Sequence, residues 1–306
     1  MKRFFTLLMA GATAFMTWSC QEKIDLDTHI DIQIGSEVES VHVDALLEYD
    51  EIMPLNRSLS AGAQGGDCWG DYFFQFVADN SRVRVFDLSK KQLVQTIYIP
   101  SSQRGFVPNC HCNTVCFGTE YYDTEDSFPL IYVSTGYADD NEYTGALVYR
   151  LTENNGVFSI SLVQTVRFPL SITSWTEFVP AGDYGYLCYT RRRIIYKVNM
   201  PKLKEGDIII DPKDALKSYQ FTPQPEWMSS SRNQDRVFYQ GKIAYISGVP
   251  QAGEASALVF LNLDNLEREK IYDLKKNGLT NESESIFVWQ GSLCIAFVDR
   301  IIKLKI

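Results

Sequence analysis

The sequence YFFQFVADNSRVRVFDL, residues 72–88, decides the fold of this chain. Its first six residues are aromatic, β-branched or otherwise compatible with a buried β-strand. The turn-forming residues 78–81 follow. Residues 82–88 then alternate between charged and apolar side chains, which is typical of a strand with one side packed and the other in water. The stretch therefore predicts a β-hairpin.

The same two-strand pattern returns four times, at residues 130–151, 185–199, 242–264 and 293–306. The positions that end the first strand of each copy are spaced 56, 56, 57 and 52 residues apart: Val77, Val133, Tyr189, Ile246 and Val298. A third strand-like run precedes each of the last four copies, and a fourth run follows each of the first four. Four strands at a fixed period are typical of propeller blades. We expect an all-β chain folded as a five-bladed β-propeller; a β-sandwich, the rival fold, would not explain the even spacing.

The last copy lacks a fourth run because the sequence stops at Ile306. Glu37–Glu51, EVESVHVDALLEYDE, precedes the first complete repeat and has the length of a strand and its connection. Pairing of this segment with the last copy would hide two open sheet edges. We therefore expect a ring closed by an N-terminal strand.

The amino-terminal end has the pattern of a targeting segment. Lys2 and Arg3 are followed by an apolar run, residues 4–18, that is too short to span a bilayer comfortably. Cys20 directly follows this run and Ser19. We expect residues 1–19 to be a signal peptide, 20–36 a tether and 37–306 the propeller domain. An ordinary cleaved signal peptide and an uncleaved anchor are the alternatives.

The Ser19-Cys20 junction resembles the lipobox of bacterial lipoproteins, in which the cysteine carries the lipid. The loose box and the acidic residues that follow it are similar to lipoproteins of Bacteroidetes-type bacteria: Glu22, Asp25, Asp27 and Asp31. The resemblance implies lipid attachment at Cys20, an outer-membrane location in the cell envelope and, for some relatives, export to the cell surface.

The charge of the chain excludes some partners. The formal net charge is -9, and it becomes -11 once Lys2 and Arg3 are removed with the signal peptide. The largest basic cluster is the triplet Arg191-Arg192-Arg193. We therefore expect no nucleic-acid binding. No other apolar run is long enough to span a membrane, so we expect contact with the membrane through the lipid only. We also expect a monomeric chain.

NCHCNTVCFG, residues 109–118, is the most unusual segment. Its three cysteines share one face of a strand and His111 faces the other way, so the spacing does not suit a zinc site and we expect no metal. We expect Cys188 and Cys294 to be small core residues. If a disulfide exists, Cys68 with Cys110 or Cys112 is the first pairing to test.

His111-Cys112-Asn113, followed by a hydrophobic strand and by the segment PLIYVS at residues 129–134, resembles a pattern of uncharacterised Bacteroidetes propeller lipoproteins, some described as TolB-like. Those relatives usually have six blades, so the resemblance implies six as the alternative to five.

In a propeller, the loops that enter the innermost strands share one face with the loops that join the second and third strands. We expect a ligand-binding site on that face, formed by His111, Asn113, Trp175, Glu177, Trp227, Arg232, Asn233 and Glu284. Trp175 and Trp227 could stack on a sugar or a peptide ring, or simply pack at a blade junction. The acidic loop at residues 138–143 has oxygen ligands suited to calcium, but a solvated turn fits its irregular spacing better.

No common catalytic motif is present, and the chain has only three histidines. We therefore expect a non-catalytic module, without a cofactor, that binds a glycan, a peptide or a protein. The alternative is a secreted glycan-active enzyme with two carboxyl groups about 5 to 9.5 Å apart, since some five-bladed propellers are glycosidases.

Overall fold

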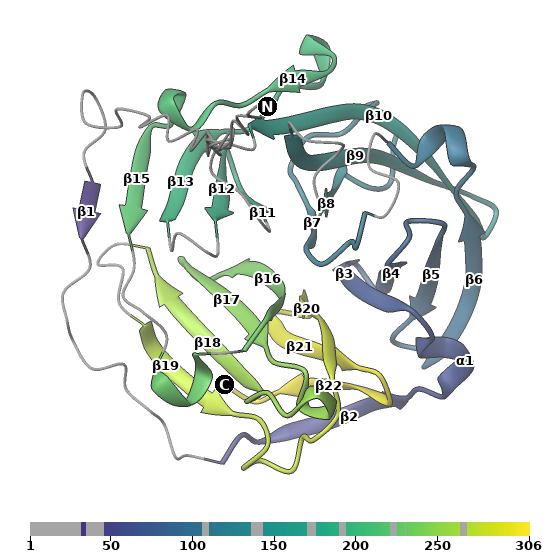
Figure 1. Cartoon of the computed structure of the whole chain (residues 1–306). Helices are drawn as coiled ribbons and strands as arrows, with labels where there is room; N and C mark the ends of the chain where they lie inside the picture. Colours follow the sequence, from purple (N-terminus) through teal and green to yellow (C-terminus); the bar gives the residue numbers. More distant parts are fainter. Residues whose placement is uncertain are drawn as a thin grey trace, which may run out of the picture.

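The structure is a computed structural model that describes residues 32–34, 46–105, 110–135, 143–169, 176–189, 194–220, 225–229, 231–263 and 268–306. Five β-sheets stand around a central axis in this part of the chain, each with its innermost strand toward the axis (Figure 1). The predicted five-bladed β-propeller is confirmed, and the described residues form neither a sandwich nor six blades.

Each blade is an antiparallel meander, and its strands are named from the innermost to the outermost. Blade I consists of β3 (Ala63–Trp69), β4 (Tyr72–Val77), β5 (Arg82–Asp87) and β6 (Gln92–Tyr98). Blade II consists of β7 (Val115–Phe117), β8 (Ile131–Thr135), β9 (Tyr143–Asn154) and β10 (Val157–Pro169). Blade III consists of β11 (Thr176–Ala181), β12 (Tyr184–Tyr189), β13 (Ile194–Asn199) and β15 (Lys217–Gln220). Blade IV consists of β16 (Asn233–Tyr239), β17 (Lys242–Ser247), β18 (Ala257–Asn262) and β19 (Arg268–Asp273).

Blade V takes its outermost strand from the amino-terminal part of the chain. It consists of β20 (Ser283–Trp289), β21 (Ser292–Phe297), β22 (Arg300–Leu304) and β2 (Tyr49–Pro54). β2 runs antiparallel to β22, with Tyr49 opposite Leu304 and Pro54 opposite Arg300. The strand begins later than the segment expected from the sequence and shares only residues 49–51 with it. Residues 37–45 of that segment lie outside the described part of the chain.

Two short strands extend the ring at its outer edge, and neither has a periodic signal in the sequence. β14 (Ile208–Ile209) pairs in parallel with β10, and β1 (Ile32–Ile34) pairs in parallel with β15. The helical segments are equally short: α1 (Arg57–Ser60), η1 (Ser101–Gln103), η3 (Leu203–Glu205), η4 (Pro212–Asp214), η5 (Glu226–Met228) and η6 (Pro250–Ala252). No helix among the described residues is long and apolar enough to cross a membrane.

β3 was also missed, because its sequence AQGGDCW is poor in strand-forming residues. The glycines have a packing role. A Cβ atom at Gly65 would lie 2.1 Å from the backbone oxygen of Asn113, a residue of the segment that immediately precedes β7 in blade II. The Gly65 N–H also donates to the backbone oxygen of Cys112 at 2.8 Å. Blade I can therefore approach blade II this closely only with glycine at position 65.

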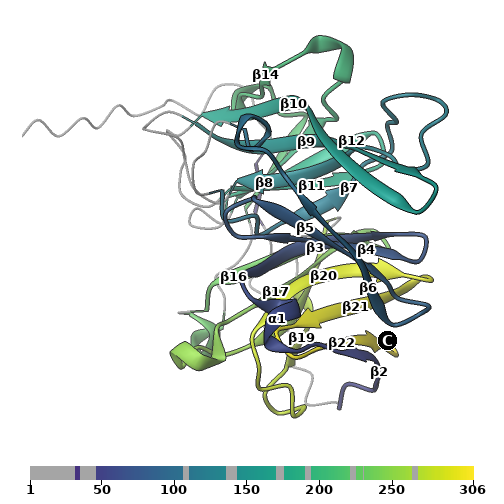
Figure 2. The ribbon, with the colours of Figure 1, turned by 90° about the vertical axis from the view of Figure 1, so that its right-hand side faces the viewer.

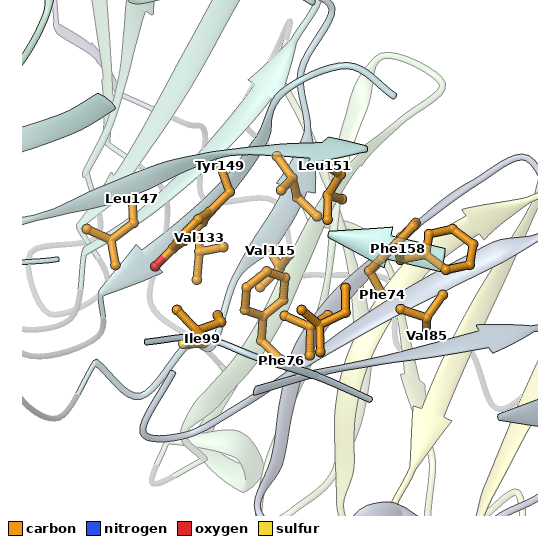
Figure 3. Packing of buried hydrophobic residues seen from close by; sticks show 14 of the residues in the cluster. Phe74, Phe76, Val85, Ile99, Val115, Val133, Leu147, Tyr149, Leu151 and Phe158 are labelled. Atoms are coloured by element: carbon orange, nitrogen blue, oxygen red, sulfur yellow. The ribbon is translucent and has the colours of Figure 1, made fainter. Parts of the chain in front are cut away.

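An apolar cluster fills each of the five gaps between neighbouring blades. Between blades I and II, Phe74 meets the rings of Phe117, Phe128 and Phe158 edge-on, at centroid distances of 5.4 to 5.9 Å. Figure 3 shows part of this cluster, with Phe74 and Phe158 labelled. Burial of one such side chain contributes about 1.5–3 kcal/mol, and edge-on ring contacts add to it. The blades are thus joined face to face by apolar packing. Their innermost strands lie toward the central axis of the ring.

Candidate functional site

The propeller has two faces, which Figure 2 shows from the side. The top face is the one on which the innermost strands β3, β7, β11, β16 and β20 begin. The bottom face carries the turns β3–β4, β5–β6, β9–β10 and β20–β21. Among the residues expected at a binding site, Asn113, Asn233 and Glu284 lie on the top face, where the innermost strands begin around the central axis. We call this axis the channel and its top end the mouth.

Carboxyl groups inside the channel join neighbouring blades. The Asp67 carboxylate accepts hydrogen bonds from the N–H of Cys68 and, in blade II, from the N–H of Phe117, both at 2.8 Å. Asp235 repeats the arrangement in blade IV, where it accepts from its neighbour Arg236 at 2.7 Å and from Ile286 of blade V at 2.9 Å. Both carboxyls therefore hold two blades together.

Burial changes the proton affinity of these two carboxyl groups. It raises the pKa of Asp67 to about 7, although the two backbone N–H donors oppose the shift. Burial also raises the pKa of Asp235 well above its usual range, and the nearby carboxylates of Asp67 and Glu177 add to that effect. The channel interior therefore takes up protons more readily than ordinary surface carboxylates do.

Glu177, one of the predicted ligand-binding residues, lies in an ion pair between blades III and IV. Its carboxylate accepts from the Nε–H of Arg236, and the side chains of Arg236 and Glu177 are 2% and 0% exposed. The guanidinium also lies over the ring of Tyr245, 4.7 Å from its centroid. Glu177 therefore contributes to blade assembly inside the channel rather than to a surface that a ligand reaches.

Asn113 and Asn233, by contrast, meet at the mouth of the channel as expected. The Asn113 side-chain amide donates to the backbone oxygen of Asn233 at 3.2 Å, so that blade II contacts blade IV across the ring. On the same face, Gln64 of blade I donates to the Glu284 carboxylate of blade V at 3.3 Å. Amide and carboxyl groups from four blades thus surround the top of the channel.

Several of these residues lie at irregularities in strand pairing. β16 has a register shift between Asn233 and Asp235, and β20 has the corresponding shift between Ser283 and Ser285. The extra residues are Gln234 and Glu284, and a third shift in β3 includes Gln64. Bulges re-aim side chains and are common next to functional sites. The sequence could not reveal them, because a bulge shows only in the pairing of two strands.

Several buried oxygen atoms around the mouth have no hydrogen-bond partner among the described residues. They are Asn113 Oδ1, Thr114 Oγ1, Thr176 Oγ1, Asn233 Oδ1 and Ser283 Oγ. Buried polar atoms nearly always have a partner in a protein or in ordered water. These atoms lie below the surface, so an ordered water or a movement of side chains is needed to satisfy them.

Two glutamates with raised pKa values, Glu282 and Glu284, lie in the same region. Burial raises the pKa of Glu284 well above its usual range, and the nearby Glu282 carboxylate raises it further. Burial also raises the pKa of Glu282, whose carboxylate accepts from Gln234 at 2.9 Å. The Glu284 carboxyl therefore binds a proton more readily than an exposed glutamate does, and its protonated form can donate as well as accept.

His111 lies at the blade I–blade II junction of the top face. Its backbone has a φ of 49°, and its N–H donates to the Ala78 oxygen at 2.6 Å. Burial lowers the pKa of the imidazole, which favours the neutral ring. The Sγ atoms of Cys110 and Cys112, on either side of His111 in the sequence, lie 3.5 Å apart.

The remaining predicted residues lie farther out. Arg232 forms an ion pair with Glu254 at 2.7 Å, and this carboxylate also accepts from Val249 N–H at 3.1 Å, which fixes the loop between β17 and β18. Trp227 is on η5 and is 36% exposed. Trp175, the arginine triplet 191–193 and residues 138–142 of the acidic loop lie outside the described residues.

The cysteines of the described chain are all free and buried. Cys188 and Cys294 are core residues, as predicted. Cys68 packs with Cys294 between blades V and I, whereas Cys110 and Cys112 pack between blades I and II, so the pairing proposed for Cys68 is not formed. No group of three His, Cys, Asp or Glu side chains in the described ranges has the geometry of a metal site.

Comparisons with known proteins extend the description of the fold only. No family model matches the sequence, and no curated protein matches it. The chain is similar in structure to the glutaminyl cyclase of Myxococcus xanthus, with a TM-score of 0.48 and 10% identity over 90% of this chain and 97% of that chain. It is also similar to the β-propeller domain of Cps50 (Swd1) from Myceliophteria thermophila, with a TM-score of 0.42 and 9% identity over 84% and 99% of the two chains.

A third similar structure is BamB from Moraxella catarrhalis, with a TM-score of 0.31 and 10% identity over 76% of this chain. This chain spans 54% of that protein. Likenesses this distant carry no inference about a ligand or a reaction. The chain is a five-bladed β-propeller module by the arrangement of its own sheets.

Proposed function

We propose that this propeller is a ligand-binding module, held at the cell envelope by a lipid on Cys20, and that the mouth of its channel on the top face binds the ligand. The observation that carries the proposal is the meeting of amide and carboxyl groups from four blades on the top face, where the partly exposed Asn233 accepts from Asn113 and Gln64 donates to Glu284. Such groups favour a ligand rich in hydroxyl or N–H donors, which is the chemistry of a glycan or a peptide.

The hydrogen bonds and the ion pair made by the carboxyl groups in the channel support binding rather than catalysis. Asp67 and Asp235 bond to backbone N–H groups of the next blade, and Glu177 is paired with Arg236. A glycosidase needs two carboxyl groups that face the substrate. Groups that hold blades together are poorly placed for that role, so the glycan-active enzyme remains the second hypothesis and becomes an outcome of the test.

The test compares the wild type with Asn233→Ala on a glycan array and in a peptide-library binding assay. The substitution removes a side-chain acceptor at the mouth and keeps the backbone oxygen that accepts from Asn113. The matched control is Asn199→Ala, at the exposed bottom-face end of β13. We expect Asn233→Ala to weaken binding about fivefold or more, as the loss of one buried hydrogen bond would.

Equal binding by Asn233→Ala and the wild type would contradict a site at the mouth. Release of reducing sugar from a bound glycan, lost in Glu284→Gln, would instead favour the enzyme. The lipid anchor is tested separately: we expect a palmitate analogue to label the wild type and not Cys20→Ser. Unlabelled wild-type protein in the medium would contradict the anchor and leave the ligand site untouched.

A further inference from the structure

The bottom face carries a groove that is remote from the proposed top-face site. It has a volume of about 350 Å³ and lies where turns of blades I and II meet. The turn β3–β4 contributes Trp69, Asp71 and Tyr72, and the turn β5–β6 contributes Asp87 and Lys90. Blade II contributes Phe128 from the loop before β8 and Glu153 from the end of β9. This volume suits one extended side chain or a small molecule.

Exposed aromatic rings mark the groove and its rim. Trp69, which lines the groove, is 37% exposed, and Tyr121 and Tyr122 near it are 40% and 47% exposed. The Trp69 ring is held by Phe117, 5.7 Å away between centroids, and by Tyr121 at 6.4 Å. A large ring that is supported from behind and open to solvent offers a ready platform for a ligand.

The groove is also acidic. Its described lining holds three carboxyl side chains, Asp71, Asp87 and Glu153, against the single cation Lys90. Lys90 is already paired with Asp87, at 2.7 Å. Asp71 accepts one hydrogen bond through Oδ1, from the indole N–H of Trp289 at 2.9 Å, and Glu153 accepts one through Oε1, from the Gly156 N–H. Two carboxylates beside an exposed aromatic ring therefore keep an oxygen each for a ligand, as far as the described residues show.

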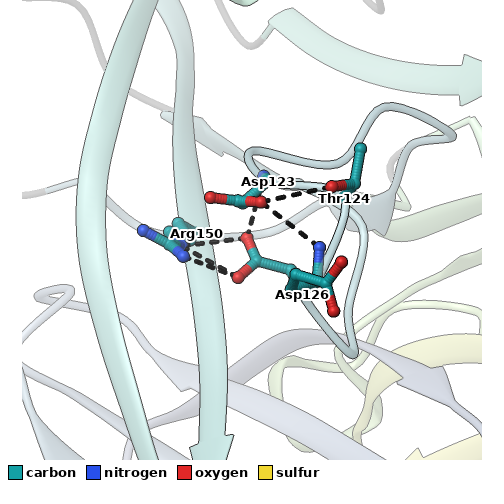
Figure 4. A network of polar contacts seen from close by, with 5 residues as sticks. Asp123, Thr124, Asp126 and Arg150 are labelled. Carbon is teal, nitrogen blue, oxygen red and sulfur yellow. Dashed lines mark hydrogen bonds and ion pairs between the residues drawn. The ribbon is translucent and has the colours of Figure 1, made fainter.

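The loop that forms the far wall is held in place before any ligand arrives. Asp126 accepts from Arg150 Nη2 at 2.6 Å and from Arg150 Nε at 2.9 Å, as Figure 4 shows. The guanidinium also lies 4.5 Å from the centroid of the Tyr122 ring. The loop thus carries Ser127 and Phe128 to the groove on a fixed base. A preformed wall lowers the ordering cost of binding.

We propose that this groove binds an alkyl-ammonium or guanidinium group, with its aliphatic stem along Trp69 and its charge against Asp71 and Glu153. Cations are attracted both to the faces of indole rings and to carboxylates. The net charge of -9 for the whole chain favours the approach of such ligands as well. Lysine and arginine side chains of a peptide, or a free diamine, present this chemistry.

The experiment measures binding by calorimetry at low ionic strength, with three cationic probes and one neutral sugar. Nα-acetyl-lysine methylamide and Nα-acetyl-arginine methylamide represent a peptide, 1,5-diaminopentane represents a free amine, and cellobiose is the sugar. We expect the cations to bind, with an affinity that falls as salt is added. Binding of the diamine alone would identify a free amine as the source, and binding of the two amino-acid probes would identify a peptide.

Two substitutions remove charge and keep the structural hydrogen bonds. Asp71→Asn retains an acceptor for Trp289, and Glu153→Gln retains one for Gly156. We expect each to weaken cation binding about fivefold, and Trp69→Leu to weaken it by a similar factor. Glu48→Gln, on an exposed residue next to β2, is the matched control and should bind as the wild type does.

The unfolding midpoints of all four variants show whether a loss of binding reflects a loss of fold. The proposal is overturned if no cationic probe binds at millimolar concentration, or if Asp71→Asn and Glu153→Gln bind them as the wild type does. Binding of cellobiose that depends on Trp69 and not on the carboxylates would also overturn it. None of these results bears on Asn233, so the top-face proposal stands or falls separately.

Discussion

The buried ion pair of Glu177 and Arg236 makes a sharp prediction about stability. Glu177→Gln would leave a guanidinium in the channel without its carboxylate, and Arg236→Met would leave the carboxylate without its cation. The side chains of Arg236 and Glu177 are 2% and 0% exposed, so water cannot replace the missing partner. We expect each single substitution to destabilise the fold strongly, and the double substitution to cost less than the sum of the two.

The magnitude follows from the burial of the pair. Removal of one partner of a buried ion pair costs about 3–5 kcal/mol, because an uncompensated charge remains in a medium of low polarity. For a domain of this size, that loss lowers the unfolding midpoint by about 6–20 °C. Replacement of both charges by groups of similar volume is often close to neutral, so the coupling energy should be a large fraction of either single effect.

The two single variants should also differ in their dependence on pH. An arginine stays charged throughout the accessible range, so the cost of Glu177→Gln should be the same at pH 5 and pH 8. In Arg236→Met, burial without a cation should place the folded-state pKa of Glu177 above its unfolded value. The protonated form would then stabilise the fold at low pH, and that contribution would be lost as the pH rises. Arg236→Met should be more harmful at pH 8 than at pH 5.

Urea unfolding, followed by tryptophan fluorescence and by circular dichroism at both pH values, measures these effects. Arg300→Met is the control, because it removes a cation from a largely solvated pair with Asp299 and should cost less than about 1 kcal/mol. The reasoning would be refuted if Glu177→Gln cost no more than Arg300→Met. It would also be refuted if the two single effects simply added in the double variant.

Three further outcomes are expected. Burial raises the pKa of Asp67 to about 7, so the stability gained from its protonated form is complete below about pH 4 and is lost as the pH rises through 7. Asp67→Asn should therefore reduce the change in unfolding free energy between these two pH values. An unchanged pH profile in this variant would contradict the raised pKa. Burial raises the pKa of Cys112 well above its usual range, so its thiol should resist iodoacetamide until the protein unfolds. The Cys110 thiol is equally buried and should be protected because the reagent cannot reach it; peptide mass mapping checks both residues. Gly65→Ala places a Cβ atom 2.1 Å from a backbone oxygen of the next blade and should lower the free energy of unfolding by about 3 kcal/mol or more. Gly182→Ala has open space around it and should lower the free energy by about 1–2 kcal/mol because of its positive φ. Equal melting temperatures for the two variants would contradict the close approach of the blades.

The repeat was readable from the sequence because every blade uses the same hairpin. The strands that end near Val77, Val133 and Val298 have the apolar or alternating sequences expected of strands in a blade. Because these hairpins recur at an even spacing, the spacing alone predicted five blades. β3 was hidden because Gly65, needed for a close approach between blades I and II, and Gly66, crowded by β4 of the same blade, remove the usual strand signal. β1 and β14 depend on pairing with a distant edge, which local sequence does not record.

The site was predictable in part. The shared face of Asn113 and Asn233 followed from propeller topology, and the structure brings these residues into contact. The ion pair of Glu177 could not be predicted from the sequence, because its partner Arg236 is 59 residues away and belongs to another blade. The bottom-face groove was missed because its residues, such as Trp69 and Asp71, belong to turns whose spacing in sequence says nothing of their meeting in space.

The pairing of β2 with β22 also determines when blade V can be completed during synthesis of the chain. β2 leaves the ribosome long before its partner, and blade V cannot be completed until residues 300–304 have been synthesised. During that interval an unpaired β2 can attract other chains, as exposed strand edges do. A chaperone that shields β2 until translation or export is complete would therefore raise the yield of folded protein more than one acting on blades I to IV, whose strands are close in sequence.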